Sequence, residues 1–220
     1  MTRLHHFLTT LFLGFMMLGI SGCNASEPGT QSVSTAPAAG QPANPRVLIE
    51  TSMGNITVEL FPAQAPQTTA NFLRYVKSGF YDGLMFHRVI PGFMIQGGGL
   101  MPDMSEKPNG SPIANEAYNG LKNLRGTLAM ARTGDPHSAT SQFFINVADN
   151  RLLDHRGKSV AGWGYAVFGK VVDGMAVVDA IVAVPRGSRG PHDDVPLEPV
   201  VMQRVSLLPE APAPATPPKQ

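Results

Sequence analysis

The residues best suited to chemistry lie in one apolar stretch, residues 86–99, whose sequence is F-H-R-V-I-P-G-F-M-I-Q-G-G-G. Arg88 is the unusual member, because an arginine among apolar side chains is costly to bury unless it has partners or faces a cleft. Its guanidinium is a rigid fork of N–H donors, and a phenylalanine, a methionine and Gln96 follow closely. This combination suits a small site that binds an apolar group and one carbonyl. The alternative is an arginine whose stem only covers the outside of a strand.

The order of residues in this stretch also predicts how it folds. Pro91-Gly92 interrupts the apolar run in its middle and is typical of a turn. The glycines at 97–99 indicate a backbone that bends or approaches another group closely. We therefore expect strand, turn, strand and then a tight loop, with Arg88 on the first strand.

Composition limits the classes of function that the chain can have. The 220 residues are 43% hydrophobic and 15% charged, which is enough for one sizeable core. The formal net charge is +1 and no block of lysine or arginine is present, so we expect no nucleic-acid partner. With one cysteine, the chain can form no internal disulfide.

Other kinds of catalytic site find little support in the sequence. His87, His137 and His155 accompany many serines and aspartates, but no G-x-S-x-G hydrolase motif is present. The six histidines show neither H-x-x-x-H nor H-E-x-x-H spacing, and no G-K-[ST] follows the glycines at 97–99. We therefore expect no metal and no cofactor.

The N-terminus has the pattern of an export signal. Arg3 precedes an uncharged apolar run over residues 7–20, which is shorter than the roughly 20 residues of a membrane span. The ending I-S-G-C at Cys23 resembles the bacterial lipobox, which implies a signal peptide over residues 1–22 and a lipid on Cys23. Asn24 favours the periplasmic side of an outer membrane over an inner one. A transmembrane anchor, and cleavage next to an incidental cysteine, are the alternatives.

Two flanking segments lack the apolar content that ordered structure needs. Residues 23–45 consist mainly of alanine, serine, threonine, glycine, glutamine and proline, and we interpret them as a flexible tether. Residues 208–220 contain five prolines and are predicted to be a disordered tail rich in proline and alanine. The chain between them, residues 46–207, is expected to form one domain.

This domain is predicted to be mainly β. Strands are expected on both sides of S-M-G-N within residues 46–60, then at 126–130, 141–146, 165–172 and 200–207, besides those of the opening stretch. Helices are expected at 65–78 and 175–182, and loops at 100–125, 147–164 and 185–199. Many short strands with two helices indicate a sandwich or barrel whose open ends the helices cover.

A series of motifs resembles the cyclophilin family. The motifs F-H-R-V-I-P-G-F-M-I-Q-G-G from Phe86, L-A-M-A from Leu128, S-Q-F-F-I from Ser141, V-F-G-K from Val167 and Gly174-Met175 occur in the family's order. The resemblance covers essentially all of residues 46–207. It implies an eight-stranded antiparallel β-barrel capped by two α-helices, and cis–trans isomerisation of peptide bonds that precede proline.

The resemblance also assigns roles to individual residues. It implies that Arg88 is the catalytic arginine, supported by Gln96, and that Gln142 holds the substrate backbone. The remaining implied substrate-binding residues are the proline pocket, Phe93, Met94, Phe144 and Leu153, the strand Ala131-Arg132-Thr133, and the flanking Leu152 and Tyr165.

Three positions depart from the pattern of many family members. Leu152 aligns where eukaryotic members have a tryptophan, and Tyr165 aligns with a pocket histidine, which speaks against tight cyclosporin binding. The tryptophan of this chain, Trp163, lies in a loop longer than theirs. Arg132 replaces an asparagine and adds a charge beside the peptide groove, which bears on substrate preference.

Taken together, the sequence predicts a monomeric isomerase that accelerates rotation about Xaa-Pro bonds in exported, unfolded polypeptides. The alternative is a membrane-tethered chaperone or proline-peptide binding module in which turnover is incidental. Client proteins and the preferred residue before proline are left open.

Overall fold

The computed structural model of the chain describes residues 44–209. The predicted signal peptide, the cysteine of the lipobox, nearly all of the tether and all but the first two residues of the predicted tail lie outside the described residues. No helix between residues 44 and 209 is both long and apolar enough to cross a membrane.

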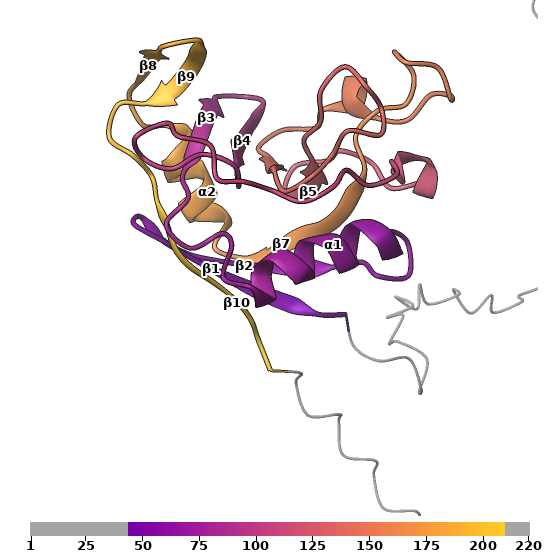
Figure 1. Cartoon of the computed structure of the whole chain (residues 1–220), viewed down its shortest axis with the longest axis horizontal. Helices are drawn as coiled ribbons and strands as arrows, with labels where there is room; N and C mark the ends of the chain where they lie inside the picture. The colour runs from indigo at the N-terminus through magenta and orange to yellow at the C-terminus, as the bar shows by residue number, and fades with distance from the viewer. Residues whose placement is uncertain (1–43, 210–220) are drawn as a thin grey trace, which may run out of the picture. The chain divides into compact units, whose positions relative to one another are not determined.

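A curled antiparallel sheet forms the body of the described domain (Figure 1). Its strands, in the order in which they are hydrogen-bonded, are β10 (Met202–Leu207), β1 (Arg46–Thr51), β2 (Gly54–Leu60), β7 (Val167–Asp173), β5 (Thr127–Met130), β6 (Phe143–Asn146), β4 (Met94–Gly97) and β3 (Phe86–Ile90). Each of these pairs is antiparallel.

The two edges of this sheet approach each other just before β3 and β10. Met85 forms an isolated antiparallel bridge with Val201, and the amide of Met202 donates to the carbonyl of Leu84 at 2.7 Å. The amide of Phe86 donates to the carbonyl of Val200 at 2.9 Å. The sheet of eight strands in residues 44–209 therefore curls back on itself, which confirms the predicted mainly β, eight-stranded antiparallel fold with two helices.

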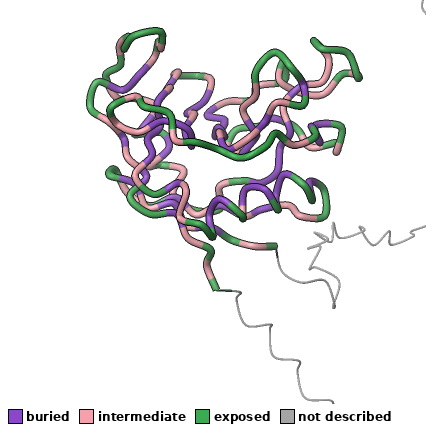
Figure 2. The backbone as a smooth tube through the Cα atoms, viewed as in Figure 1, coloured by how far each residue is buried: buried purple, intermediate pink, exposed green. Residues whose placement is uncertain are grey.

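The helices α1 (Pro66–Lys77) and α2 (Met175–Val182) contribute to the interior of this curled sheet. The ring of Phe72 in α1 is fully buried, 5.2 Å from the ring of Tyr81 and 5.4 Å from that of Phe143. Val178 and Ile181 of α2, three positions apart and so on one side of the helix, are fully buried too. Figure 2 shows the buried residues along the strands and on one side of α1.

One hairpin departs from the prediction of a loop at residues 185–199. Strands β8 (Arg186–Arg189) and β9 (His192–Pro196) pair with each other, and β9 lies beside β3. Their sequences, R-G-S-R and H-D-D-V-P, are polar and lack the apolar alternation by which strands are usually detected. The two other predicted loops contain short 3₁₀ turns, η1 (Ala117–Asn119) and η2 (Arg151–Leu153).

Candidate active site

The opening stretch places Arg88 in a row of side chains that crosses four neighbouring strands. Arg88 of β3 pairs with Gln96 of β4, Gln96 pairs with Phe144 of β6, and Phe144 pairs with Ala129 of β5. Directly paired residues in a sheet project from the same face, so these four side chains share one face. The sequence positions them through the period of two that each strand imposes.

The opposite face of the same strands forms the main core. Val89, Ile95, Ile145 and Leu128, each next in sequence to a member of the row, are fully buried and belong to the central hydrophobic cluster. A second, smaller cluster lies on the face of Arg88. It consists of buried Met94, Ala129, Phe144 and Val167, with Ile90, Phe93, Leu121, Ala131, Leu153 and Tyr165 packed against it.

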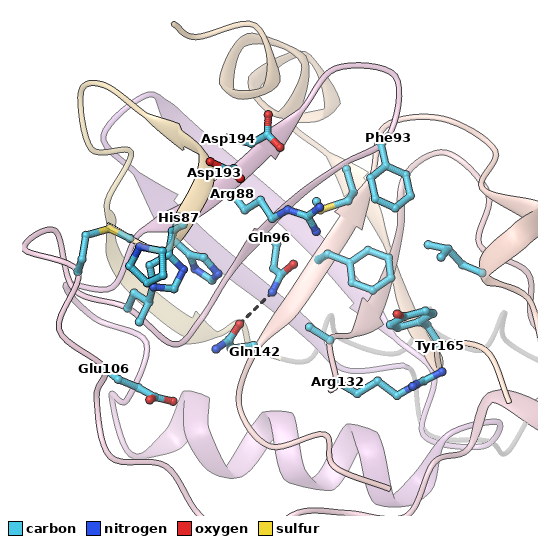
Figure 3. Close-up of a pocket in the computed structure, with 18 residues that line it drawn as sticks. His87, Arg88, Phe93, Gln96, Glu106, Arg132, Gln142, Tyr165, Asp193 and Asp194 are labelled. Atoms are coloured by element: carbon cyan, nitrogen blue, oxygen red, sulfur yellow. Dashed lines mark hydrogen bonds between the residues drawn. The ribbon is translucent and has the colours of Figure 1, made fainter. Parts of the chain in front are cut away.

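A groove of about 720 Å³ runs over this second face (Figure 3). Ten predicted site residues line it, namely Arg88, Phe93, Met94, Gln96, Ala131, Arg132, Gln142, Phe144, Leu153 and Tyr165. Its other lining residues are His87, Leu100, Met104, Glu106, Pro191, His192, Asp193 and Asp194. The fold thus brings together residues that lie up to 107 positions apart, from His87 to Asp194.

Two residues expected at the site do not line the groove. The side chain of Leu152 is directed outward and the residue is 81% exposed, whereas Leu153, the next residue of the turn η2, lies in the groove. Thr133 bonds away from it, because its amide and its hydroxyl both donate to the Ser138 hydroxyl, at 2.9 and 2.8 Å. Successive residues of a tight turn project in different directions, so adjacency in sequence did not imply a shared surface.

The floor of the groove is apolar and closely packed. Met94 is 2% exposed and Phe144 is 4% exposed. The ring of Phe144 meets the ring of Tyr165 edge to face, at 5.7 Å between centroids. Phe93 and Leu153 are only partly buried at its border, which leaves apolar surface for a ligand to cover.

Gln96 and Gln142 are held together beside this floor. The Nε2 of Gln96 donates to the Oε1 of Gln142 at 2.9 Å, as the dashed line in Figure 3 marks. Gly99 lies directly against Gln142, because a Cβ on Gly99 would stand 2.6 Å from the Nε2 of Gln142. The close approach that the sequence predicted for the glycines at 97–99 is therefore present here.

Arg88 is half-buried and lacks a carboxylate partner. Among residues 44–209 it takes part in no ion pair. Asp193 and Asp194 line the same groove, but the Oδ1 of Asp193 accepts from Ser188 at 2.6 Å and that of Asp194 from Arg186 at 3.2 Å. The guanidinium is therefore available to a ligand on the apolar floor.

His87 was not predicted to line the same groove as Arg88. Strict alternation along a strand would place neighbours on opposite faces, but the pairing of β3 with β4 shifts register between Phe86 and Arg88. His87 is 5% exposed, and burial, reinforced by His192 and Arg88, lowers its pKa to about 4. Its imidazole is therefore uncharged at neutral pH, so no imidazolium is present there to act as a general acid.

Arg132 is fixed at the border of the groove. Its guanidinium carbon lies 4.6 Å from the centre of the Tyr165 ring. Its Nε donates to the carbonyl of Gly164 at 3.0 Å, and one terminal nitrogen donates to the carbonyl of Thr133 at 2.8 Å. The departure from asparagine noted in the sequence thus puts an ordered cation in the groove wall.

The remaining lining residues carried no signal in the sequence. Leu100, Met104 and Glu106 come from the long loop after β4, and Pro191, His192, Asp193 and Asp194 come from the β8–β9 hairpin. The carbonyl of Pro102 accepts from Arg189 at 2.9 Å, which ties the two segments together.

Among residues 44–209 no group of three histidine, cysteine or acidic residues could hold a metal ion.

Comparisons with known proteins agree with this fold and groove. The family model described as cyclophilin type peptidyl-prolyl cis-trans isomerase/CLD matches residues 46–207. Peptidyl-prolyl cis-trans isomerase cyp18 of Streptomyces antibioticus is 59% identical over 162 residues, which are 74% of this chain and 98% of that protein. Peptidyl-prolyl cis-trans isomerase B of Escherichia coli is 56% identical over 161 residues, 73% of this chain and 98% of the relative.

Solved structures give the same result. A cyclophilin type peptidyl-prolyl cis-trans isomerase of Cryptosporidium parvum superposes with a TM-score of 0.65 and 30% identity, covering 76% of this chain and 99% of that one. The chain therefore belongs to the cyclophilin-type peptidyl-prolyl cis–trans isomerases. Its activity is the cis–trans isomerisation of peptide bonds that precede proline.

Proposed function

We propose that Arg88 catalyses this isomerisation on exported polypeptide chains, with the floor around Phe144 as the proline site. The observation that carries the proposal is the pairing of Arg88, Gln96 and Phe144 across three neighbouring strands. It supports a site in which a guanidinium without an ion-pair partner among residues 44–209 stands beside an apolar surface. A bound prolyl peptide would then present its ring to the floor and its backbone to Arg88.

Catalysis of this rotation requires a hydrogen-bond donor directed at one atom, the proline nitrogen. Amide resonance holds the Xaa-Pro bond planar and creates a barrier of about 18–20 kcal/mol. At the top of the barrier resonance is lost, and the proline nitrogen becomes pyramidal and more basic. A donor directed at that nitrogen stabilises the twisted state more than either planar state, which is what lowers a barrier. Arg88 supplies such a donor through its planar guanidinium.

Phe93, Met94, Phe144 and Leu153 would hold the proline ring still while the preceding residue turns. When the proline half of the substrate is held on an apolar surface, rotation about the Xaa-Pro bond is the one motion that the substrate still needs. The low polarity of the surface also favours the twisted amide, because loss of resonance reduces the dipole of the bond. No covalent intermediate and no proton transfer are needed, in keeping with the neutral His87 in the groove wall.

Gln96 and Gln142 would orient the reaction. The hydrogen bond between them fixes both side chains, and Gln96 is the direct cross-strand neighbour of Arg88. A fixed amide beside the guanidinium restricts its positions and offers polar atoms to the substrate backbone. We assign Gln96 to the catalytic group and Gln142 to substrate binding on this basis.

Proline-containing peptides are the expected ligands. One structure of the Cryptosporidium parvum relative, with a TM-score of 0.63 and 30% identity, was determined in the presence of the dipeptide Ala-Pro. For this chain we propose unfolded or flexible polypeptides, whose proline isomerisation is a slow folding step of tens of seconds or more.

We further propose that the protein acts as a monomeric lipoprotein on the periplasmic side of a bacterial outer membrane. The support is in the sequence: the apolar run at 7–20, the I-S-G-C ending and the low-complexity segment at 23–45. Cys23→Ser is expected to remove the lipid and release the protein from membranes. Labelling with a fatty-acid analogue followed by fractionation measures this; a labelled Cys23→Ser variant would contradict it.

The catalytic assignment is tested by exchange NMR on a peptide with one Xaa-Pro bond. The wild type should accelerate the exchange, and Arg88→Ala should lower kcat/KM by about 100-fold or more, as loss of a transition-state donor does. Arg204→Ala is the matched control, because Arg204 is exposed on β10 and does not line the groove. Near-normal turnover by a folded Arg88→Ala protein would disprove the assignment.

A further inference from the structure

The charged residues of the groove are unevenly distributed. Figure 3 shows Arg132 beside Tyr165, away from Glu106, Asp193 and Asp194. A peptide lying along the groove would therefore pass from a region with a cation in its wall to one with several carboxylates. Such an arrangement discriminates between charges on the two sides of a bound proline.

Arg132 has the features of a preformed carboxylate site. Its guanidinium is stacked on the Tyr165 ring at 4.6 Å and held by the carbonyls of Gly164 and Thr133, so little side-chain freedom remains to be lost on binding. It takes part in no ion pair within residues 44–209. Three of its five N–H groups have no partner among the same residues.

The partners of the guanidinium leave its charge uncompensated. Its two hydrogen bonds go to neutral carbonyls and its third contact is with an aromatic ring, so this half-buried cation has no counter-ion among residues 44–209. A carboxylate on the ligand would supply the counter-charge and, with its two oxygens, could accept from the planar edge of the fork.

The carboxylates that line the groove away from Arg132 disfavour a carboxylate of the ligand beside them. Asp193 and Asp194 are each satisfied by a neighbour in the β8–β9 hairpin, Ser188 and Arg186. Arg186 forms an ion pair with Asp194, whereas Asp193 is bonded to the neutral Ser188 hydroxyl, so it is the Asp193 carboxylate that a second carboxylate would meet with like charge.

We propose that this isomerase prefers proline peptides that carry an acidic side chain on the side of the proline that faces Arg132. This inference rests on the proposed function of the groove and adds a substrate class to it. The same acidic residue on the other side of the proline gives no advantage, because it faces the Asp193 carboxylate, which is bonded to a neutral hydroxyl, and an Asp194 already paired with Arg186.

The test uses the full-length protein and peptides built around a central Ala-Pro. One pair carries glutamate or its neutral isostere glutamine before the Ala-Pro, and a second pair carries them after it. Exchange NMR gives kcat/KM for each peptide, and the measured quantity is the ratio of the glutamate peptide to its glutamine partner. This internal ratio cancels any general loss of activity in a variant.

For the wild type we expect a ratio of about 2 to 5 for one placement of glutamate, as a partly exposed ion pair gives, and a ratio near or below one for the other. Arg132→Gln should bring the higher ratio to about one. Arg132→Glu should invert it, so that lysine at the same place becomes the preferred residue. Arg204→Gln, which removes an equal charge outside the groove, should leave the wild-type ratio unchanged.

The outcomes separate this inference from the proposed function. If the wild type accelerates the glutamine peptides but shows ratios near one for both placements, the preference is disproved and the isomerase assignment stands. A preference that persists in folded Arg132→Gln protein also disproves it. If the wild type does not accelerate the neutral peptides, the proposed function fails, and this inference with it.

Discussion

The Nε2 of Gln96 donates a 2.9 Å hydrogen bond to the Oε1 of Gln142, which joins β4 to the residue just before β6. Gln96 is also the cross-strand partner of Arg88, so this hydrogen bond is one contact away from the guanidinium that we propose to be catalytic. The space for Gln142 exists because residue 99 has no side chain. The orientation of the Gln142 side chain, and through it that of Gln96, therefore depends on the glycine at position 99.

Gly99→Ala should lower activity without unfolding the protein. Its Cβ would stand 2.6 Å from the Nε2 and 2.7 Å from the Cγ of Gln142, so this side chain must move and its hydrogen bond with Gln96 is lost. We expect a fall in kcat/KM of about tenfold, in line with a misplaced positioning group.

Gly134→Ala is the matched control for this change. Gly134 has nothing within 4 Å of an added Cβ, and its backbone does not require glycine. Equal activities of the two variants in a prolyl peptide assay would show that the position of Gln142 does not matter.

Leu153→Ala should weaken substrate binding more than Leu152→Ala. Leu153 lines the groove and packs against the Phe144 cluster, whereas Leu152 is 81% exposed. Removing apolar contact from a binding surface costs about 1–3 kcal/mol, so KM should rise by roughly tenfold for Leu153→Ala. Steady-state kinetics on both variants measures the difference, and a larger effect at Leu152 would contradict this placement.

Glu116 should be important for stability, because it caps a helix that lacks a cap of its own. Ala65 at the N-cap of α1 has no side-chain hydrogen bond, and the Glu116 carboxylate accepts from the amides of Gln67 and Thr68 at 3.1 and 2.8 Å. It also accepts from the Thr68 hydroxyl at 2.7 Å. Glu116→Ala should lower the free energy of unfolding by about 3 kcal/mol.

Urea denaturation measures this free energy, with Glu198→Ala as the control. Glu198 is exposed and makes no side-chain hydrogen bond within residues 44–209. If Glu116→Ala and Glu198→Ala had the same midpoint, the cap would contribute nothing.

His87 should make stability depend on pH. Burial lowers its pKa from 6.5 in the unfolded chain to about 4 in the folded one, so the unfolded state binds the proton first as the pH falls. The contribution of this group therefore leaves stability unchanged above pH 6.5 and lowers it progressively between about 6.5 and 4, by about 3 kcal/mol in total.

Replacing the histidine isolates this effect. His87→Gln should flatten the dependence of unfolding free energy on pH in that window, relative to the wild type, whatever its effect at pH 7. Thermal or urea unfolding at several pH values measures the two slopes. Parallel slopes for the two proteins would exclude His87 as the source.

The sequence was most informative where a strand pattern and a motif coincide. Arg88, Gln96 and Phe144 fall on one face because each strand alternates, and the ordered motifs carried the resemblance that the family comparison confirms. The position of His87 in the groove was not predicted, because a register shift in β3 overrides the alternation. The hairpin β8–β9 was predicted to be a loop because its strands are polar.

Which loop residues line the groove could not be predicted from the sequence, for a different reason. Leu152 and Leu153 are equally apolar neighbours, and only the geometry of the turn η2 decides which one enters the groove. Glu106 and Asp193 lie in segments without a regular period, so their approach to the groove depends on tertiary contacts such as that between Arg189 and Pro102.

The most direct test of the account separates binding from rotation at Arg88. NMR line-shape analysis of a prolyl peptide at increasing protein concentration gives both the Kd and the rate of cis–trans exchange on the protein. If Arg88 acts on the twisted state, folded Arg88→Ala protein will bind the planar peptide within about tenfold of the wild type but rotate it about 100-fold more slowly. A variant that binds far more weakly yet rotates bound peptide at the wild-type rate would contradict the account.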